Sequence, residues 1–214
     1  QFIKGQLESY VKSSKGLDSP ESPLALVQKQ DYIYYNKGAV NMFILQEKIG
    51  EKQVNLALKR FVKDWNAFDP NFNKERYATS TDLLQYFDAV TPDSLKTVVY
   101  ELFETVTSYD VELKKADVTA QEDAGYTLNL KIQLDKWQNN EIVTEANIEN
   151  TMVAVAIYGL DAADKEIVLE VHQVQMNAKS KEVSFEFKTK PTKVVLDPDY
   201  LFVDTNRENN TKKL

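Results

Sequence analysis

Residues 126–134 read YTLNLKIQL, with an apolar side chain at nearly every second position. This period of two is typical of a β-strand that buries one face. The strands expected from such alternation and from the turns between them cover 107–118, 126–134, 151–159, 167–171, 171–176, 183–187 and 193–203. About seven strands without an intervening helix predict an antiparallel β-sandwich.

The half of the chain that precedes these strands has the period of a helix. One apolar stripe with the spacing i, i+3, i+4 and i+7 consists of Val54, Ala57, Leu58, Phe61, Val62 and Trp65. Helices are also expected at 2–14 and 37–49, with Gly50 as a C-terminal cap, and from Thr79. Thr91-Pro92-Asp93 is a typical N-terminal signal and predicts a further helix that continues to Val106.

The sequence therefore predicts an α+β multidomain protein. We expect an α-helical domain at 1–106, a β-sandwich domain at 107–204 and a polar tail at 205–214. The acidic excess supports this division, because 13 basic and 14 acidic residues precede residue 107, whereas 13 basic and 19 acidic residues follow residue 106.

Composition excludes several classes of function. The net charge of −7 and the lack of a Lys/Arg-rich run argue against nucleic-acid partners. The absence of cysteine excludes disulfides, thiolate metal sites and cysteine nucleophiles, although it leaves the cellular compartment open. No apolar run approaches the ~18 residues of a membrane span. Because a helical pattern is already present at Gln1, we expect the chain to be a fragment of a longer parent protein.

The usual motifs of a self-contained active site are not found. The sequence has no H-E-x-x-H, no Gly-rich phosphate loop, no G-x-S-x-G and no calcium loop. The single histidine, His172, is a lone base or metal ligand in one interpretation and a solvent-facing strand residue in the other, which we prefer. Residues 161–164 have an aspartate at each end, but they lack the ligand spacing of a calcium site and are interpreted as a solvated turn.

One cluster has the composition of a binding site. Residues 32–38 read YIYYNKG, so that three tyrosines precede the expected start of the helix at 37–49. A phenol near the positive end of a helix can donate a hydrogen bond to an oxyanion on a substrate carbonyl. The alternative is that the tyrosines are core aromatics whose hydroxyls contact water.

Tyr35-Asn36-Lys37-Gly38, followed by an apolar helix and Ile49-Gly50-Glu51, resembles the Y-x-K-G segment of aminopeptidase N-like zinc metallopeptidases (gluzincins). Residues 57–61 are similar to the next helix of that family, and 78–84 to its helix start. The segments at 91–95, 102–104 and 196–210 resemble, more narrowly, bacterial membrane proteins in which a peptidase-like part is joined to a transporter permease region.

The resemblance implies a role for individual residues. Tyr35 would hydrogen-bond the oxyanion of the tetrahedral intermediate, opposite the zinc ion. Lys37 and Gly38 match the motif as structural residues, with Gly38 allowing close packing at the helix start. In the family, the zinc ligands and the segment that binds the substrate amine precede Y-x-K-G, and none of them occurs here. The chain alone is therefore expected to be catalytically inactive and to hold no metal or cofactor, whereas the parent would hold zinc.

Three hypotheses remain open at this point. The chain is a fragment of a zinc aminopeptidase that acts on peptide substrates, with the N-terminal catalytic half of the same polypeptide as its partner. Alternatively, it is a non-catalytic scaffold or peptide-binding domain attached to a membrane transporter, in which case Tyr35 is a binding or core residue. Finally, it is an independent interaction module. A membrane-associated bacterial parent is implied by the resemblance alone.

Overall fold

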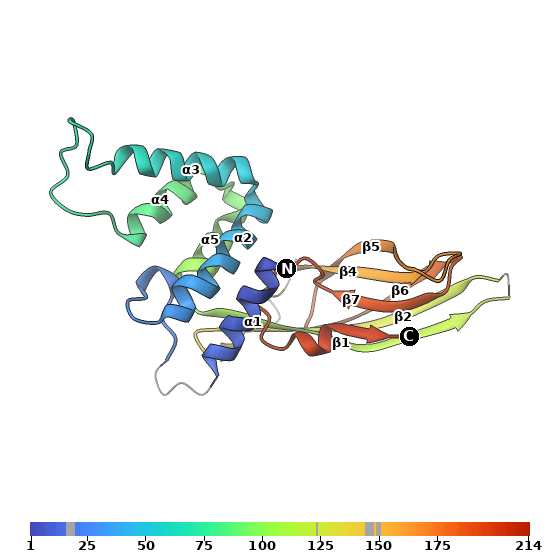
Figure 1. Cartoon of the computed structure of the whole chain (residues 1–214). Helices are drawn as coiled ribbons and strands as arrows, with labels where there is room; N and C mark the ends of the chain where they lie inside the picture. Colours follow the sequence, from blue (N-terminus) through green and yellow to red (C-terminus); the bar gives the residue numbers. More distant parts are fainter. Residues whose placement is uncertain (16–19, 123, 144–147, 149–150) are drawn as a thin grey trace. The chain divides into compact units, whose positions relative to one another are not determined.

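The computed structural model describes residues 1–15, 20–122, 124–143, 148 and 151–214. The chain divides into two compact units, Gln1–Thr107 and Ser108–Leu214, which are described separately (Figure 1). Within the described residues no helix has the length and apolar character needed to cross a bilayer.

The first unit is helical. Its elements are α1 (Phe2–Ser14), η1 (Leu24–Leu26), η2 (Tyr32–Lys37), α2 (Gly38–Ile49), α3 (Glu51–Asp64), α4 (Ser80–Val90), η3 (Asp93–Leu95), α5 (Lys96–Val99) and η4 (Tyr100–Glu104). The predicted junction between α2 and α3 is confirmed: Gly50 has φ of +92°, a conformation that favours glycine. Thr79 and Asp82 form a capping box at the start of α4, as the sequence predicts for a helix from Thr79.

The predicted helix from Thr91 to Val106 is wrong in detail. The segment forms a 3₁₀ turn, a single α-helical turn and a π-helical turn in succession, and it ends at Glu104. Thr91 is the C-cap of α4 rather than an N-cap. Its hydroxyl donates to the carbonyl oxygen of Phe87 at 2.7 Å, which satisfies a free carbonyl at the end of the preceding helix.

The second unit consists of antiparallel strands, as predicted. They are β1 (Thr107–Ala120), β2 (Tyr126–Gln138), β3 (Glu141–Ile142), β4 (Thr151–Leu160), β5 (Glu166–Met176), β6 (Ser180–Phe187), β7 (Pro191–Leu196) and β8 (Thr211–Lys213). One sheet has the order β1-β2-β3, with β6 also paired to β2; the other has the order β5-β4-β7-β8. The two strands expected at 167–171 and 171–176 are one continuous strand, β5.

Both sheets contribute side chains to one hydrophobic cluster. The alternating residues Leu128, Leu130, Ile132 and Leu134 of β2 are all buried, which confirms that this strand has one buried face. They belong to the same cluster as Val153, Val155 and Ile157 of β4 and Val194 and Leu196 of β7. The unit therefore has the core that two facing sheets would form.

The expected polar tail at 205–214 is also wrong. Residues Arg207–Asn210 form the 3₁₀ helix η6, and Thr211–Lys213 form β8, which pairs with β7. The segment is polar in sequence, but its polar side chains form hydrogen bonds to other residues of the strand unit. Asn210 is 1% exposed and donates to Asp204 Oδ2 at 2.9 Å, and Arg207 donates to Asp197 Oδ2 at 2.6 Å.

Candidate functional site

The tyrosine cluster lies inside a helix and not before one. Residues 32–37 form the π-helical segment η2, which continues into α2 through Gly38. The amide of Gly38 donates to the carbonyl of Ile33, five residues earlier, which is the bonding pattern of a π-helix. The amide of Ile33 donates to the carbonyl of Gln30 at 2.9 Å, so the positive end of the helix is near Asp31. The expectation that the helix begins at about residue 37, after the three tyrosines, is therefore wrong.

Lys37 is a buried structural cation. It is 3% exposed, and its Nζ lies 2.5 Å from Glu21 Oε1 and 5.1 Å from the centre of the Tyr10 ring. Burial lowers the pKa of Lys37, and the adjacent Glu21 carboxylate opposes that shift. The other oxygen of Glu21 accepts a hydrogen bond from the Tyr10 hydroxyl at 2.7 Å. The contacts join η2 to α1 and to the segment that follows α1.

Further contacts fix the same segment. Asn36 Nδ2 donates to Gln6 Oε1 of α1 at 2.7 Å. The Tyr32 ring stacks on Tyr10 with 6.1 Å between the ring centres. Since α1 contacts η2 through Gln6 and Tyr10, the π-helical segment is held on one side by a second helix.

The three tyrosines have different environments. Tyr32 is partly buried, and burial and the nearby Glu21 raise its pKa. Tyr34 donates its hydroxyl to Asp31 Oδ1, and this hydrogen bond raises the pKa of Tyr34 to about 12 because it stabilises the protonated phenol. Tyr35 is 68% exposed, and among the described residues no hydrogen bond to its hydroxyl is found. Tyr35 is thus the most exposed of the three phenols, and its hydroxyl is open to a ligand.

An open hollow lies beside Tyr35. Its lining is polar and comes from the end of α1 and from the start of η2: Ser13, Lys29, Gln30, Asp31, Tyr32, Tyr35 and Asn36. The surface offers an amine, a carboxylate, amides and two phenols within one helical turn and the loop before it. This arrangement can bind a polar group such as a peptide backbone, but it provides no activated nucleophile.

Gly38 is not required for close packing. A Cβ atom at this position would lie 3.5 Å from the carbonyl oxygen of Ile33 and 3.6 Å from Leu24 Cδ1, which are ordinary van der Waals distances. The expected packing role of Gly38 is therefore wrong. Its φ of −57° is also helical, so no conformational reason for glycine is present.

The other candidates from the sequence do not form a site. His172 is partly exposed on β5, where it contacts Glu170 at 2.6 Å and stacks on Phe185. Residues 161–164 form a turn in which Asp161 Oδ1 accepts from the amides of Ala163 and Lys165. Within the described ranges no group of three or more His, Cys, Asp or Glu side chains could hold a metal ion.

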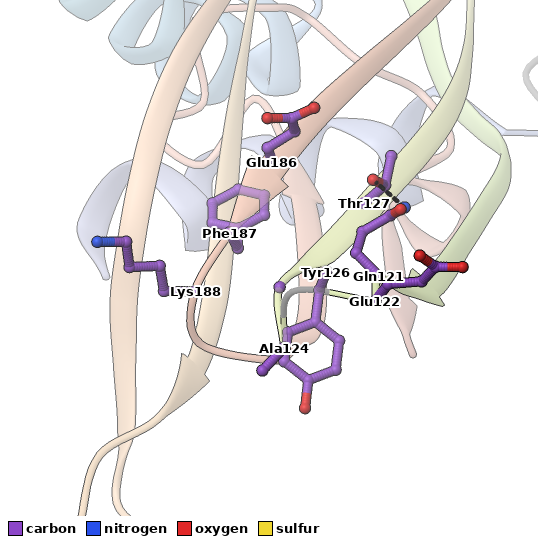
Figure 2. A pocket seen from close by; sticks show the side chains of 9 residues that line it. Gln121, Glu122, Ala124, Tyr126, Thr127, Glu186, Phe187 and Lys188 are labelled. Atoms are coloured by element: carbon purple, nitrogen blue, oxygen red, sulfur yellow. Dashed lines mark hydrogen bonds between the residues drawn. The ribbon is translucent and has the colours of Figure 1, made fainter.

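A second hollow lies at one end of the strand unit, beside the β1–β2 turn (Figure 2). Tyr126 and the buried Phe187 contribute rings to it, and Gln121 Nε2 donates to Thr127 Oγ1 at 2.6 Å. Figure 2 shows that the charged groups of Glu186 and Lys188 point in different directions. Because they do not converge, this hollow has no acid–base pair.

Comparisons with known proteins find no family model and no curated protein that match this chain. The site is therefore argued from its own geometry. Sequence reasoning missed Tyr10 and Glu21, which hold Lys37 in place. Glu21 lies in a segment rich in turn residues, where nothing in the sequence signals that an acidic side chain is nearly buried.

Proposed function

We propose that this chain supplies one wall of the active site of an aminopeptidase-like zinc metallopeptidase. In this proposal the Tyr35 hydroxyl donates a hydrogen bond to the oxyanion that forms at the scissile carbonyl. The supporting observation is that the exposed, unbonded phenol of Tyr35 is carried by a helical segment fixed through the buried Lys37–Glu21 pair. The helical unit would then be the C-terminal part of a gluzincin catalytic domain, and the strand unit the β-sandwich that follows it.

A tyrosine hydroxyl can donate the hydrogen bond to an oxyanion that this proposal assigns to Tyr35. A donor that is already oriented stabilises developing negative charge more effectively than water does, because it need not reorganise during the reaction. A π-helical turn is a frequent feature of functional sites, where it reorients side chains relative to an α-helix. Tyr34 is excluded from the same role because its hydroxyl is engaged by Asp31.

The residues described here do not fit a zinc site. The proposal therefore gives this chain the oxyanion contact and one surface for the peptide, and it assigns the zinc ligands to another segment of the parent. The substrate would be a peptide with a free N-terminus. The partner of the helical unit would be the catalytic half of the same polypeptide.

The test is a comparison of two neighbouring tyrosine variants in the full-length parent. Hydrolysis of aminoacyl 4-nitroanilides is measured for the wild type, Tyr35→Phe and Tyr34→Phe. We expect Tyr35→Phe to lower kcat by about 10²–10³ with little change in KM, which is the usual effect of removing one oxyanion donor. Tyr34→Phe should retain kcat.

Two results would overturn the proposal. A Tyr35→Phe parent that keeps kcat within a few-fold of the wild type removes Tyr35 from the mechanism. A folded parent that hydrolyses none of a panel of aminoacyl substrates favours the alternative, a non-catalytic peptidase-like scaffold or partner-binding domain attached to a membrane transporter.

A further inference from the structure

Strand β5 is an open edge. It lies at the end of the β5-β4-β7-β8 sheet, and among the described residues β4 is the strand with which it pairs (Figure 1). Its 11 residues make it longer than a typical strand of about 5–6 residues. From Glu166 to Val174 this edge presents a row of main-chain donors and acceptors that a further strand can use, whereas the carbonyl oxygen of Gln175 accepts a hydrogen bond from Lys181.

The side chains of β5 are unusual for an exposed edge. Natural proteins commonly protect such edges with lysine or proline, and β5 contains neither. Instead, apolar side chains are exposed along it: Val171 is 54%, Val168 51% and Ile167 38% exposed. Glu170 and His172, on either side of Val171, are in contact at 2.6 Å while remaining 49% and 34% exposed.

We propose that the edge of β5 binds the same edge of a second copy of this chain, in antiparallel orientation about a two-fold axis at Val171. In an isologous dimer each residue meets its counterpart across the axis. With Val171 on the axis, the two valines face each other. Glu170 of each copy then lies opposite His172 of the other copy, so the pairing forms two acid–imidazole contacts.

The charges on the strand argue against the two neighbouring registers. An axis at Glu170 would place two carboxylates directly opposite each other, and like charges in that position destabilise a sheet. An axis at His172 would oppose two imidazoles and leave Glu170 opposite the apolar Val174. The register centred on Val171 avoids both arrangements. The stack of His172 on Phe185, with 4.2 Å between ring centres, holds the imidazole at the edge.

The absence of cysteine from the chain allows a direct test of the register. Directly opposite residues of an antiparallel pair have Cα atoms about 4.5–5.5 Å apart, which is within the range of a disulfide. The full chain carrying Val171→Cys should therefore become a covalent dimer under mild oxidation. The matched control is Val168→Cys, because the two copies of residue 168 would be separated by six residues of strand, or about 20 Å.

The two cysteine variants should give different crosslinking results. A covalent dimer of the Val171→Cys chain, with little dimer of the Val168→Cys chain, is the expected result. No dimer with either variant, or equal yields with both, overturns the proposed register. Non-reducing electrophoresis and intact mass spectrometry provide the measurement.

A charge exchange tests the pairing without a crosslink. In sedimentation equilibrium of the cysteine-free chain, Glu170→Lys should weaken dimerisation at least tenfold, because the introduced amine would face the imidazole. Adding His172→Glu to the same chain should restore most of the affinity. A wild-type chain that stays monomeric at high micromolar concentration, or a double variant no tighter than the single one, contradicts the proposal.

Discussion

Lys37 and Glu21 form a nearly buried ion pair between the π-helical segment that carries Tyr35 and the segment after α1. Their side chains are 4% and 12% exposed, and the Nζ and Oε1 atoms are 2.5 Å apart. Removing one partner of a buried pair leaves a charge without compensation, which typically costs about 3–5 kcal/mol, whereas replacing both with apolar residues of similar volume can be nearly neutral.

We therefore expect Lys37→Met to destabilise the helical unit by about 3 kcal/mol, with a smaller loss in the double variant Lys37→Met/Glu21→Met. Urea denaturation followed through Trp65, in a Trp137→Phe background, measures the free energy of unfolding of this unit. Equal losses in the single and double variants would show that the pair is not coupled.

Asp197 predicts a pH dependence for the strand unit. Its carboxylate is 1% exposed, and it accepts hydrogen bonds from Arg207 and from the amide of Leu201. Burial nevertheless raises the pKa of Asp197 from 3.8 to about 6, although Arg207 and the amides oppose the shift. The folded state thus binds the proton more tightly than the unfolded chain does.

The stability that Asp197 contributes is therefore complete below about pH 4 and is lost as the pH rises through about 6. Relative to Asp197→Asn, which cannot ionise, the wild type should lose about 2 kcal/mol between pH 4 and pH 7. Urea denaturation at a series of pH values, followed through Trp137 in a Trp65→Phe background, measures this difference. A difference that is constant with pH would contradict it.

Two glycines of the helical unit predict opposite effects of the same substitution. Gly38 has φ of −57° and room for a Cβ atom, so Gly38→Ala should stabilise the unit by about 0.5–1 kcal/mol. Gly50 also has room, but its φ of +92° and ψ of 141° are strained for alanine, so Gly50→Ala should destabilise by about 1–3 kcal/mol. Thermal unfolding followed by circular dichroism measures whether each variant is more or less stable than the wild type.

The predictable parts of the fold are those with a strong local pattern. The alternation of β2 and the apolar stripe of α3 each specify one buried face, and Gly50 and Thr79 mark helix ends through local chemistry. Such features depend on residues close in sequence, so a single sequence is enough to find them.

Two of the shortcomings, the expected tail and the missed supports of Lys37, concern residues whose partners are distant in sequence. Residues 205–214 look like a tail because their polarity is visible while their partners, Asp197 and β7, are not. At the candidate site, Tyr35 could be singled out from its motif. The support from Tyr10 and Glu21 could not, because Glu21 contacts Tyr10 and Lys37, which are 11 and 16 residues away in the sequence.

Asp82 predicts that the helical unit weakens in acid. Its carboxylate accepts hydrogen bonds from Arg76 at 2.6 and 2.7 Å and from the Thr79 amide at 2.8 Å. The hydrogen bonds from Arg76 hold the pKa of Asp82 well below its usual range, with a further contribution from Thr79.

A lowered pKa in the folded state gives stability that is present above the usual pKa of 3.8 and is lost as the pH falls toward the folded value. The melting temperature of Asp82→Asn should therefore lie below that of the wild type at pH 6, and the gap should narrow as the pH falls below 3.8. Asp93→Asn, which changes a fully exposed carboxylate, is the control and should show little difference from the wild type at pH 6. A gap between Asp82→Asn and the wild type that is as wide at pH 3 as at pH 6 would mean that the charge of Asp82 does not stabilise the helix start.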